Sequence, residues 1–206
     1  MKITDNIDKI KSLLKFKEGI FYYVQVIQRK KENPELPKSD LKRYQTFITS
    51  LEDLDIHIPR IKKICNDYNA RAYISLIPRS LEKLAKECLL EYAKRVANEE
   101  YKQAWSIPNR VALNDNIRAK GVYNKPFWLF DIDNAEHYPA IKEIIEDKGI
   151  KIFETIDTPN GIHVLVEAFN PKLLAKYKKG EDYEFPNGEK FTFRGDSNTI
   201  LFAVSP

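Results

Sequence analysis

Residues 128–133 read Trp-Leu-Phe-Asp-Ile-Asp, an apolar run that ends in two acids one residue apart. Side chains alternate along a strand, so Asp131 and Asp133 are expected on one face and Phe130 and Ile132 on the other. A lone buried carboxylate is unfavourable unless it takes up a proton or meets a counter-charge. Mg²⁺ suits such a pair because it binds through one or two carboxylates, waters and substrate phosphates. The simpler interpretation is a pair of acids at a strand end that bind nothing.

A second acidic pattern serves as a comparison. The stretch Asp53-Leu-Asp55-Ile-His57 also places polar groups at every second position. We interpret it as the solvated side of an amphipathic strand, or as the acidic cap of a helix that opens near Pro59.

Length and composition favour a globular protein in a reducing compartment. A chain of 206 residues with 43% hydrophobic content can bury a substantial core, as one large domain or two small lobes. The first 17 residues are charged and do not resemble a signal peptide, and no apolar run approaches membrane-spanning length. Cys65 and Cys88 stand singly on helical patterns, as buried free thiols do. We therefore expect a cytoplasmic protein with no membrane partner.

Basic and acidic residues are unevenly distributed along the chain. Residues 1–120 carry 24 Lys and Arg against 16 Asp and Glu, whereas residues 121–206 carry 10 against 14. A basic region joined to an acidic one suits a protein that attracts a polyanion and uses its own acids to bind metal.

Hydrophobic periodicity predicts an α+β fold with one or more mixed sheets flanked by helices. Helices are expected over residues 2–16, 41–51, 59–68, 80–103, 138–147 and 172–178. Strands are expected over residues 20–28, 71–77, 127–133, 150–156, 161–169, 190–193 and 199–204. We expect residues 1–69 to form a helical, basic N-terminal lobe and residues 70–206 a second domain, with one continuous domain as the alternative.

A turn and a histidine follow the acid pair. Residues 158–163 read Thr-Pro-Asn-Gly-Ile-His and lead into a strand on which His163 is the first polar side chain. A histidine there can donate to a phosphate oxygen, and Gly161 permits close approach of the backbone to a ligand. The alternative is an ordinary hairpin turn with a surface histidine.

These stretches resemble the motifs of the archaeo-eukaryotic primase superfamily, in its phage and plasmid type. Phe130-Asp-Ile-Asp133 resembles the first motif and Gly161-Ile-His163 the second. The strand over residues 72–79, which ends in Pro-Arg, and the closing residues 193–206 are similar to further segments of that family. The resemblance covers residues 70–206.

The resemblance implies an RNA-recognition-like catalytic lobe and a primase or polymerase that joins nucleoside triphosphates on a single-stranded or primed DNA template. It also implies host cytoplasm and a possible helicase or other replication partner. Asp131 and Asp133 would bind Mg²⁺ or Mn²⁺ for two-metal transfer, and His163 would contact the triphosphate. The remaining candidate nucleotide-binding residues lie in the turn or carry a guanidinium that matches phosphate oxygens; they are Thr158, Asn160, Gly161, Arg79 and Arg194.

One position departs from the family pattern. Thr192 stands where the family has a third metal-binding acid, and Asp196 and then Glu189 are the nearest acids. If Asp196 substitutes, the metal site is complete but shifted. If no acid does, the alternative function is a catalytically reduced member of the fold that binds nucleotide or nucleic acid without polymerising it.

Two other enzyme classes share the Asp-x-Asp pattern: phosphatases with Asp131 as nucleophile, and metal-dependent glycosyltransferases. The phosphatase pattern usually has Thr or Val where this chain has Ala135. Separately, the basic region predicts salt-sensitive binding of nucleic acid through its phosphates. Aromatic residues that could stack on bases, or simply pack in the core, are Phe21, Tyr22, Tyr23, Tyr44 and Tyr101.

Overall fold

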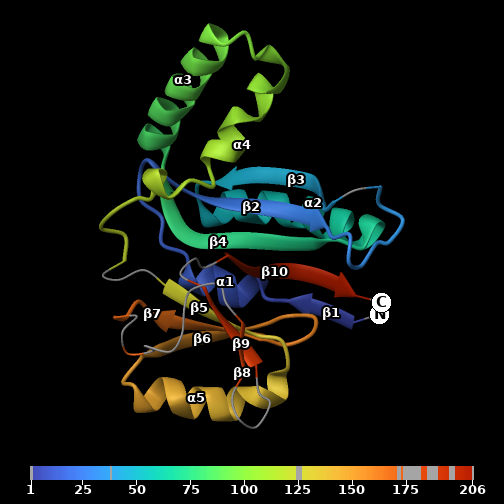
Figure 1. The fold of residues 1–206 in the computed structure, drawn as a ribbon, viewed down its shortest axis with the longest axis vertical. Coiled ribbons are helices and arrows are strands. Elements are labelled where there is room, and N and C mark those ends of the chain that lie inside the picture. Colours follow the sequence, from blue (N-terminus) through green and yellow to red (C-terminus); the bar gives the residue numbers. More distant parts are fainter. Residues whose placement is uncertain are drawn as a thin grey trace.

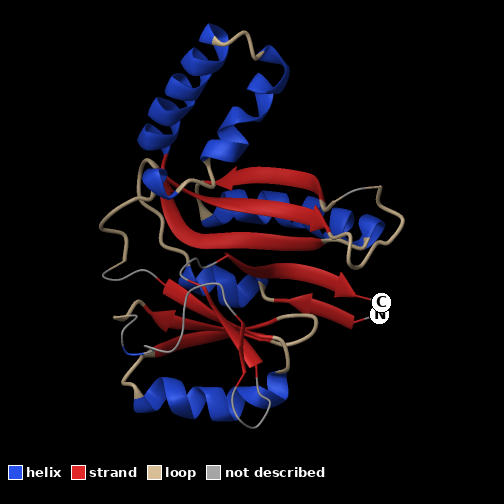
Figure 2. Ribbon diagram, in the orientation of Figure 1, coloured by secondary structure: helices blue, strands red, loops and turns tan. Residues whose placement is uncertain are grey.

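The computed structural model is an α+β protein with two antiparallel sheets (Figures 1 and 2). The structure describes residues 2–37, 39–123, 127–170, 173, 182–184, 190–194 and 198–205. Every strand pairing among these residues is antiparallel, so the prediction of a mixed sheet is wrong. None of the described helices combines the length and hydrophobicity needed to cross a bilayer.

The first sheet joins the two ends of the chain. Its strand order is β1-β10-β4-β2-β3. The strands are β1 (Lys2–Asp5), β2 (Ile20–Gln28), β3 (Leu41–Ile48), β4 (Arg71–Ser80) and β10 (Asn198–Ser205). Because Lys2 pairs with Ser205, the two termini lie side by side (Figure 1). Residues 1–69 therefore contribute three strands to a sheet that β4 and β10 complete.

The second sheet carries the predicted acid pair. Its strand order is β6-β7-β5-β9-β8. The strands are β5 (Phe127–Ile132), β6 (Ile152–Asp157), β7 (Ile162–Glu167), β8 (Asp182–Glu184) and β9 (Lys190–Arg194). Helix α5 (Tyr138–Asp147) covers one face, where Ile141 and Ile145 pack against Phe130 and Ile132. The opposite face of β5 turns Leu129 toward the core shared with the first sheet.

Helices α1 (Ile7–Leu13) and α2 (Leu51–Tyr68) contribute to that shared core, with α1 lying between the two sheets (Figure 1). Ser50 caps α2, since its hydroxyl accepts the Asp53 N–H at 3.0 Å. Asp53 in turn accepts the Thr49 N–H at 2.9 Å. The Asp53–His57 stretch is therefore helical and its first acid is a cap, while the helix begins at Leu51 rather than near Pro59.

A helical arm extends from the first sheet (Figure 1). It consists of α3 (Leu81–Ala97), the 3₁₀ turn η1 (Tyr101–Ser106) and α4 (Ile107–Val111), followed by η2 (Asp115–Ile117). Ser80 caps α3, because its hydroxyl accepts the Lys83 N–H at 3.3 Å. Cys88 and Ile107 of the arm pack against Phe21 of the sheet. The turn η3 (Ala135–His137) leads into α5.

Of two helix predictions near the N-terminus, the one over residues 41–51 is wrong and the one over residues 2–16 is right only in part. Residues 41–51 form β3 and the start of α2, because Tyr44, Thr46 and Ile48 recur at the two-residue period of a strand. Residues 2–16 contain β1 before α1, because β1 is held by pairing with β10 at the far end of the chain. Of the helix predicted over residues 172–178, all but Leu173 lies outside the described residues.

Candidate functional site

Strand register places Asp131 directly opposite His163. The two residues are partners in the β5–β7 ladder, and His163 Nε2 lies 3.3 Å from Asp131 Oδ1. The exposed fractions of their side chains are 10% for His163 and 19% for Asp131, so the pair is largely shielded from water. The structure therefore brings together the central residues of the two predicted motifs.

The His163 ring is held from both sides. Its Nδ1 lies 2.8 Å from the hydroxyl of Thr199, a fully buried residue of β10. A neutral ring that donates from Nε2 to Asp131 can accept the Thr199 hydroxyl at Nδ1. Both ring nitrogens thus have protein partners, and the arrangement suits a histidine that orients the Asp131 carboxylate.

The turn before β7 packs on the end of β5. A Cβ added to Gly161 would lie 1.9 Å from the carbonyl oxygen of Ile132 and 2.7 Å from that of Asp133. The close approach that Gly161 permits is therefore to protein backbone next to the acid pair. The turn is closed by the Gly161 N–H, which donates to the Thr158 hydroxyl at 2.9 Å. Asn6 anchors it by donating to the Asp157 carbonyl at 2.9 Å.

Asp133 lies just beyond β5 and is exposed, yet it lines the same cavity as Asp131. This cavity has a volume of about 470 Å³ and lies between the two sheets. Residues of the second sheet and its turn form one wall: Asp131, Asp133, Thr158, Asn160, His163 and Thr192. Residues from β4, β10 and the loop after β2 form the other: Arg29, Lys31, Arg71, Tyr73, Asn198 and Ile200.

The wall opposite the acids is basic. Arg71 is buried and bound to Glu32 through two contacts, Nε to Oε2 at 3.0 Å and Nη2 to Oε1 at 2.5 Å. Arg29 Nη1 approaches the same carboxylate at 3.3 Å. Burial raises the pKa of the neighbouring Tyr73, against the opposing effect of the Arg29 and Arg71 charges. The cavity therefore has carboxylates on one side and guanidinium groups on the other.

Asp131 and Asp133 fit a divalent cation whose other coordination positions are filled by a bound substrate and by water. Carboxylate oxygens suit Mg²⁺ and Mn²⁺, and two carboxylates are enough when phosphates and waters complete the coordination. Within the described part of the chain no group of three or more His, Cys, Asp or Glu residues could hold a metal alone. Thr192 is the partner of Asp131 in β9, and Asp196 lies outside the described residues.

Other predicted residues lie elsewhere. Arg79 is buried and donates to the Asn114 carbonyl at 2.7 Å, and it is not among the residues that line the cavity. Arg194 pairs with Leu129 in the ladder, and its side chain is outside the described part.

The aromatic residues that were candidates for base stacking differ in their exposure. Phe21, Tyr22 and Tyr23 are core residues with at most 1% exposed, so they cannot stack on bases. Tyr44 contacts His57 at 2.7 Å, whereas Tyr101 is exposed.

The residues missed from the sequence are Arg29, Lys31, Arg71, Tyr73 and Thr199. A basic Arg-Lys-Lys run directly after the strand Ile20–Gln28 was the available signal for the loop. For Arg71 and Tyr73 the signal was two polar residues two positions apart at the start of a strand. Nothing near Thr199 in the sequence indicates a histidine partner 36 residues away.

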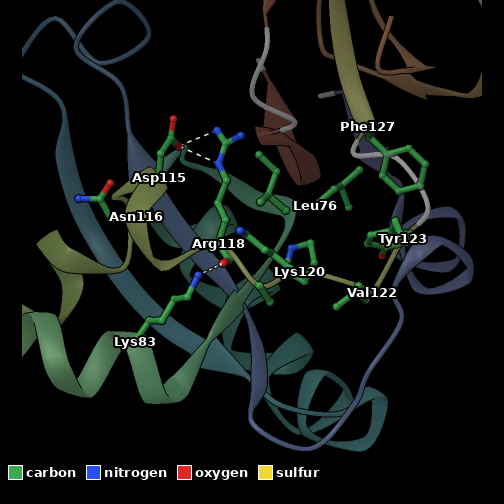
Figure 3. A pocket seen from close by; sticks show the side chains of 13 residues that line it. Leu76, Lys83, Asp115, Asn116, Arg118, Lys120, Val122, Tyr123 and Phe127 are labelled. Atoms are coloured by element: carbon green, nitrogen blue, oxygen red, sulfur yellow. Dashed lines mark hydrogen bonds and ion pairs between the residues drawn. The ribbon is translucent and has the colours of Figure 1, made fainter.

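A second cavity lies at the other end of β5 (Figure 3). It has a volume of about 590 Å³ and lies beside Phe127, where Leu76 and Val122 give it an apolar wall. Arg118 at its edge is paired with Asp115, and Lys83 donates to the Arg118 carbonyl at 2.9 Å (Figure 3). The described residues that line it include none of the predicted site residues.

No family model, curated protein or solved structure matches this chain.

Proposed function

We propose that the protein is a primase–polymerase-like nucleotidyltransferase that joins nucleotides on a DNA template with the help of Mg²⁺ or Mn²⁺. The observation that carries the proposal is the contact between Asp131 and His163 in a polar cavity that Asp133 also lines. The two residues come from the two motifs that resemble the primase superfamily, and they are partners in one ladder.

The order of the second sheet supports the RNA-recognition-like part of the resemblance. Strand β5 is followed by α5, β6 and β7, and β9 lies on the other side of β5. This order corresponds to the first part and the last strand of a β-α-β-β-α-β unit.

Each residue of the site has a distinct task in this proposal. Asp131 and Asp133 would hold the divalent cations, which would lower the pKa of the attacking 3′-hydroxyl and offset charge on the departing pyrophosphate. His163 holds the Asp131 carboxylate in position, and Thr199 fixes the histidine ring. Thr158 and Asn160 line the same wall and would contact the bound nucleotide.

Primer synthesis on single-stranded DNA tests the proposal. We expect product with nucleoside triphosphates and Mn²⁺, and none from Asp131→Ala combined with Asp133→Ala. The matched control is Asp55→Ala with Asp67→Ala, which removes two exposed acids outside the cavity. Equal product from the wild type and the Asp131/Asp133 variant would disprove the assignment.

A second candidate function is a catalytically reduced member of this fold. The observation that favours it is Thr192, which occupies the ladder position opposite Asp131 and offers no carboxylate. Tight nucleotide binding without primer synthesis under Mg²⁺ or Mn²⁺ would support this alternative, and robust primer extension would exclude it.

A further inference from the structure

The loop after β2 presents cations to the cavity, and buried polar contacts fix this loop. Asn33 is 5% exposed and donates to the carbonyls of Arg29 at 2.9 Å and Asn69 at 3.1 Å. Gln28 donates to the Asn33 side chain at 3.1 Å, and Asn69 donates to the Glu32 carbonyl at 3.2 Å. The position of Arg29, Lys31 and Glu32 is therefore set before any ligand arrives.

Glu32 holds the two arginines at the cavity edge. Its carboxylate takes Nε and Nη2 of Arg71 and lies 3.3 Å from Arg29 Nη1. The side chain of Arg71 is 8% exposed, so its orientation is constrained by packing as well as by this ion pair. This part of the wall contains three cations, Arg29, Lys31 and Arg71, against the one carboxylate of Glu32 and thus retains positive charge.

We infer that this wall is a phosphate-binding site for the phosphate chain of a nucleoside triphosphate, with Glu32 as the residue that positions Arg71. A planar guanidinium matches phosphate oxygens through paired hydrogen bonds. The opposite wall carries the two carboxylates suited to a divalent cation, and such cations are coordinated by substrate phosphates. A polyphosphate can therefore be bound from both sides of the cavity.

The size of the cavity favours a nucleotide over a polynucleotide backbone. A volume of about 470 Å³ is within the range of roughly 300–1,000 Å³ that is usual for small-ligand sites. A template strand would instead run along an open surface and depend on many dispersed cations. The inference depends on the proposed function for the identity of the ligand, but the phosphate chemistry can be measured without catalysis.

The test compares two double variants that leave the net charge unchanged. Arg71→Gln with Glu32→Gln removes the guanidinium and its partner together and keeps amide groups that can bond to each other. The matched control is Arg95→Gln with Glu100→Gln, which removes an ion pair of 3.3 Å on the helical arm. Binding of ATP and of inorganic tripolyphosphate is measured by calorimetry in Mg²⁺, and binding of a fluorescent oligothymidylate by anisotropy at one salt concentration.

We expect the Arg71/Glu32 variant to bind ATP and tripolyphosphate about tenfold to a hundredfold more weakly, as the loss of charged hydrogen bonds implies. Its affinity for oligothymidylate should match that of the control. An ATP affinity equal to the control's overturns the inference. So does the absence of tripolyphosphate binding by the wild type, or an equal loss for oligothymidylate, which would make the wall a contact for the nucleic-acid backbone.

Arg29→Gln provides a second variant should the double variant fail to fold. Arg29 is more exposed than Arg71, and its loss leaves the Arg71–Glu32 pair intact. We expect a smaller decrease in ATP affinity, about threefold to tenfold, and an unchanged affinity overturns the inference.

Primer synthesis separates failure of the inference from failure of the proposed function. Wild type that binds ATP through this wall but makes no primer contradicts the polymerase function alone. If the wild type makes primer while the wall variants keep full ATP affinity, only the assignment of phosphate binding to this wall is contradicted.

Discussion

Gly161 offers the sharpest test of how the acid pair is positioned. Replacing it with alanine adds a Cβ that would lie 1.9 Å from the Ile132 carbonyl oxygen, about 1.5 Å short of the 3.4 Å at which ordinary contact begins. Ile132 cannot move away freely, because it is fully buried and paired with Ile162 in the ladder. Relief therefore requires a shift of the turn or of the end of β5, and the second of these moves Asp133.

The expected cost follows from that clash. Overpacking in a well-packed region typically costs 1–3 kcal/mol, and a clash with paired backbone should lie near the upper end, at about 3 kcal/mol. For a chain of this length each kcal/mol lowers the Tm by roughly 2–4 °C, so we expect a decrease of about 6–12 °C. Urea unfolding and calorimetry measure the two quantities. Primer synthesis well below the Tm should also fall, because the shift moves either Asp133 or the turn that carries Thr158 and Asn160.

Gly149→Ala is the matched control. Gly149 has φ +66 with nothing within 4 Å of an added Cβ, so its substitution introduces backbone strain but no contact. Left-handed strain costs roughly 1–2 kcal/mol and should leave primer synthesis unchanged. The reasoning is refuted if Gly161→Ala is no less stable than Gly149→Ala, or if it retains full primer synthesis and nucleotide affinity.

Three further predictions concern the scaffold and the charged surface. Ser50→Ala should lower the free energy of unfolding by about 1 kcal/mol in urea titration, because α2 loses its cap; an unchanged midpoint would contradict the capping role. Burial raises the pKa of the Cys65 thiol from 9.0 to about 12, so this residue's contribution to stability should be full below pH 9 and decline as pH rises toward 12. A Cys65→Ser variant measured beside the wild type should lack this decline, and native Cys65 should resist a thiol reagent at pH 8. Binding of oligothymidylate should weaken steeply as salt rises, since the region before residue 120 carries the basic excess, and salt-independent binding would exclude this mode.

Local patterns predicted the elements whose sequence alone decides their structure. Ile20–Gln28 forms a strand as expected because it is rich in β-branched and aromatic residues. Tyr138–Asp147 forms a helix because Ile141 and Ile145, its two buried residues, repeat at helical spacing. Residues 2–5 were missed because their strand exists through pairing with β10, which a local window cannot detect.

Site residues were predictable only where they stood next to a recognisable turn or strand end. Asp131, Asp133 and His163 each follow such a signal, and the ladder brings Asp131 and His163 into contact. The guanidinium of Arg79 at a strand end predicts a phosphate contact, but β4 continues past Pro78 and buries Arg79 against Asn114. Eight positions earlier on the same strand, Arg71 reaches the cavity. The direction of a side chain relative to another sheet depends on packing between the sheets, and one strand's sequence does not contain that information.

The contact between Thr199 and His163 links the site to the packing of the two sheets. Thr199 belongs to β10, which pairs with β4 and thereby with the strand that carries Arg71. His163 belongs to β7 and bonds to Asp131 of β5. A rotation of one sheet against the other would therefore strain the Thr199–His163 hydrogen bond and change the separation of the acidic and basic walls together. Thr199 is fully buried, so removing its hydroxyl would leave His163 Nδ1 without this partner inside the protein. The free-energy cost of such an unsatisfied buried nitrogen exceeds the net stabilisation from the hydrogen bond. The Thr199–His163 hydrogen bond, which fixes the ring that contacts Asp131, therefore links the two walls in addition to the apolar core that the sheets share.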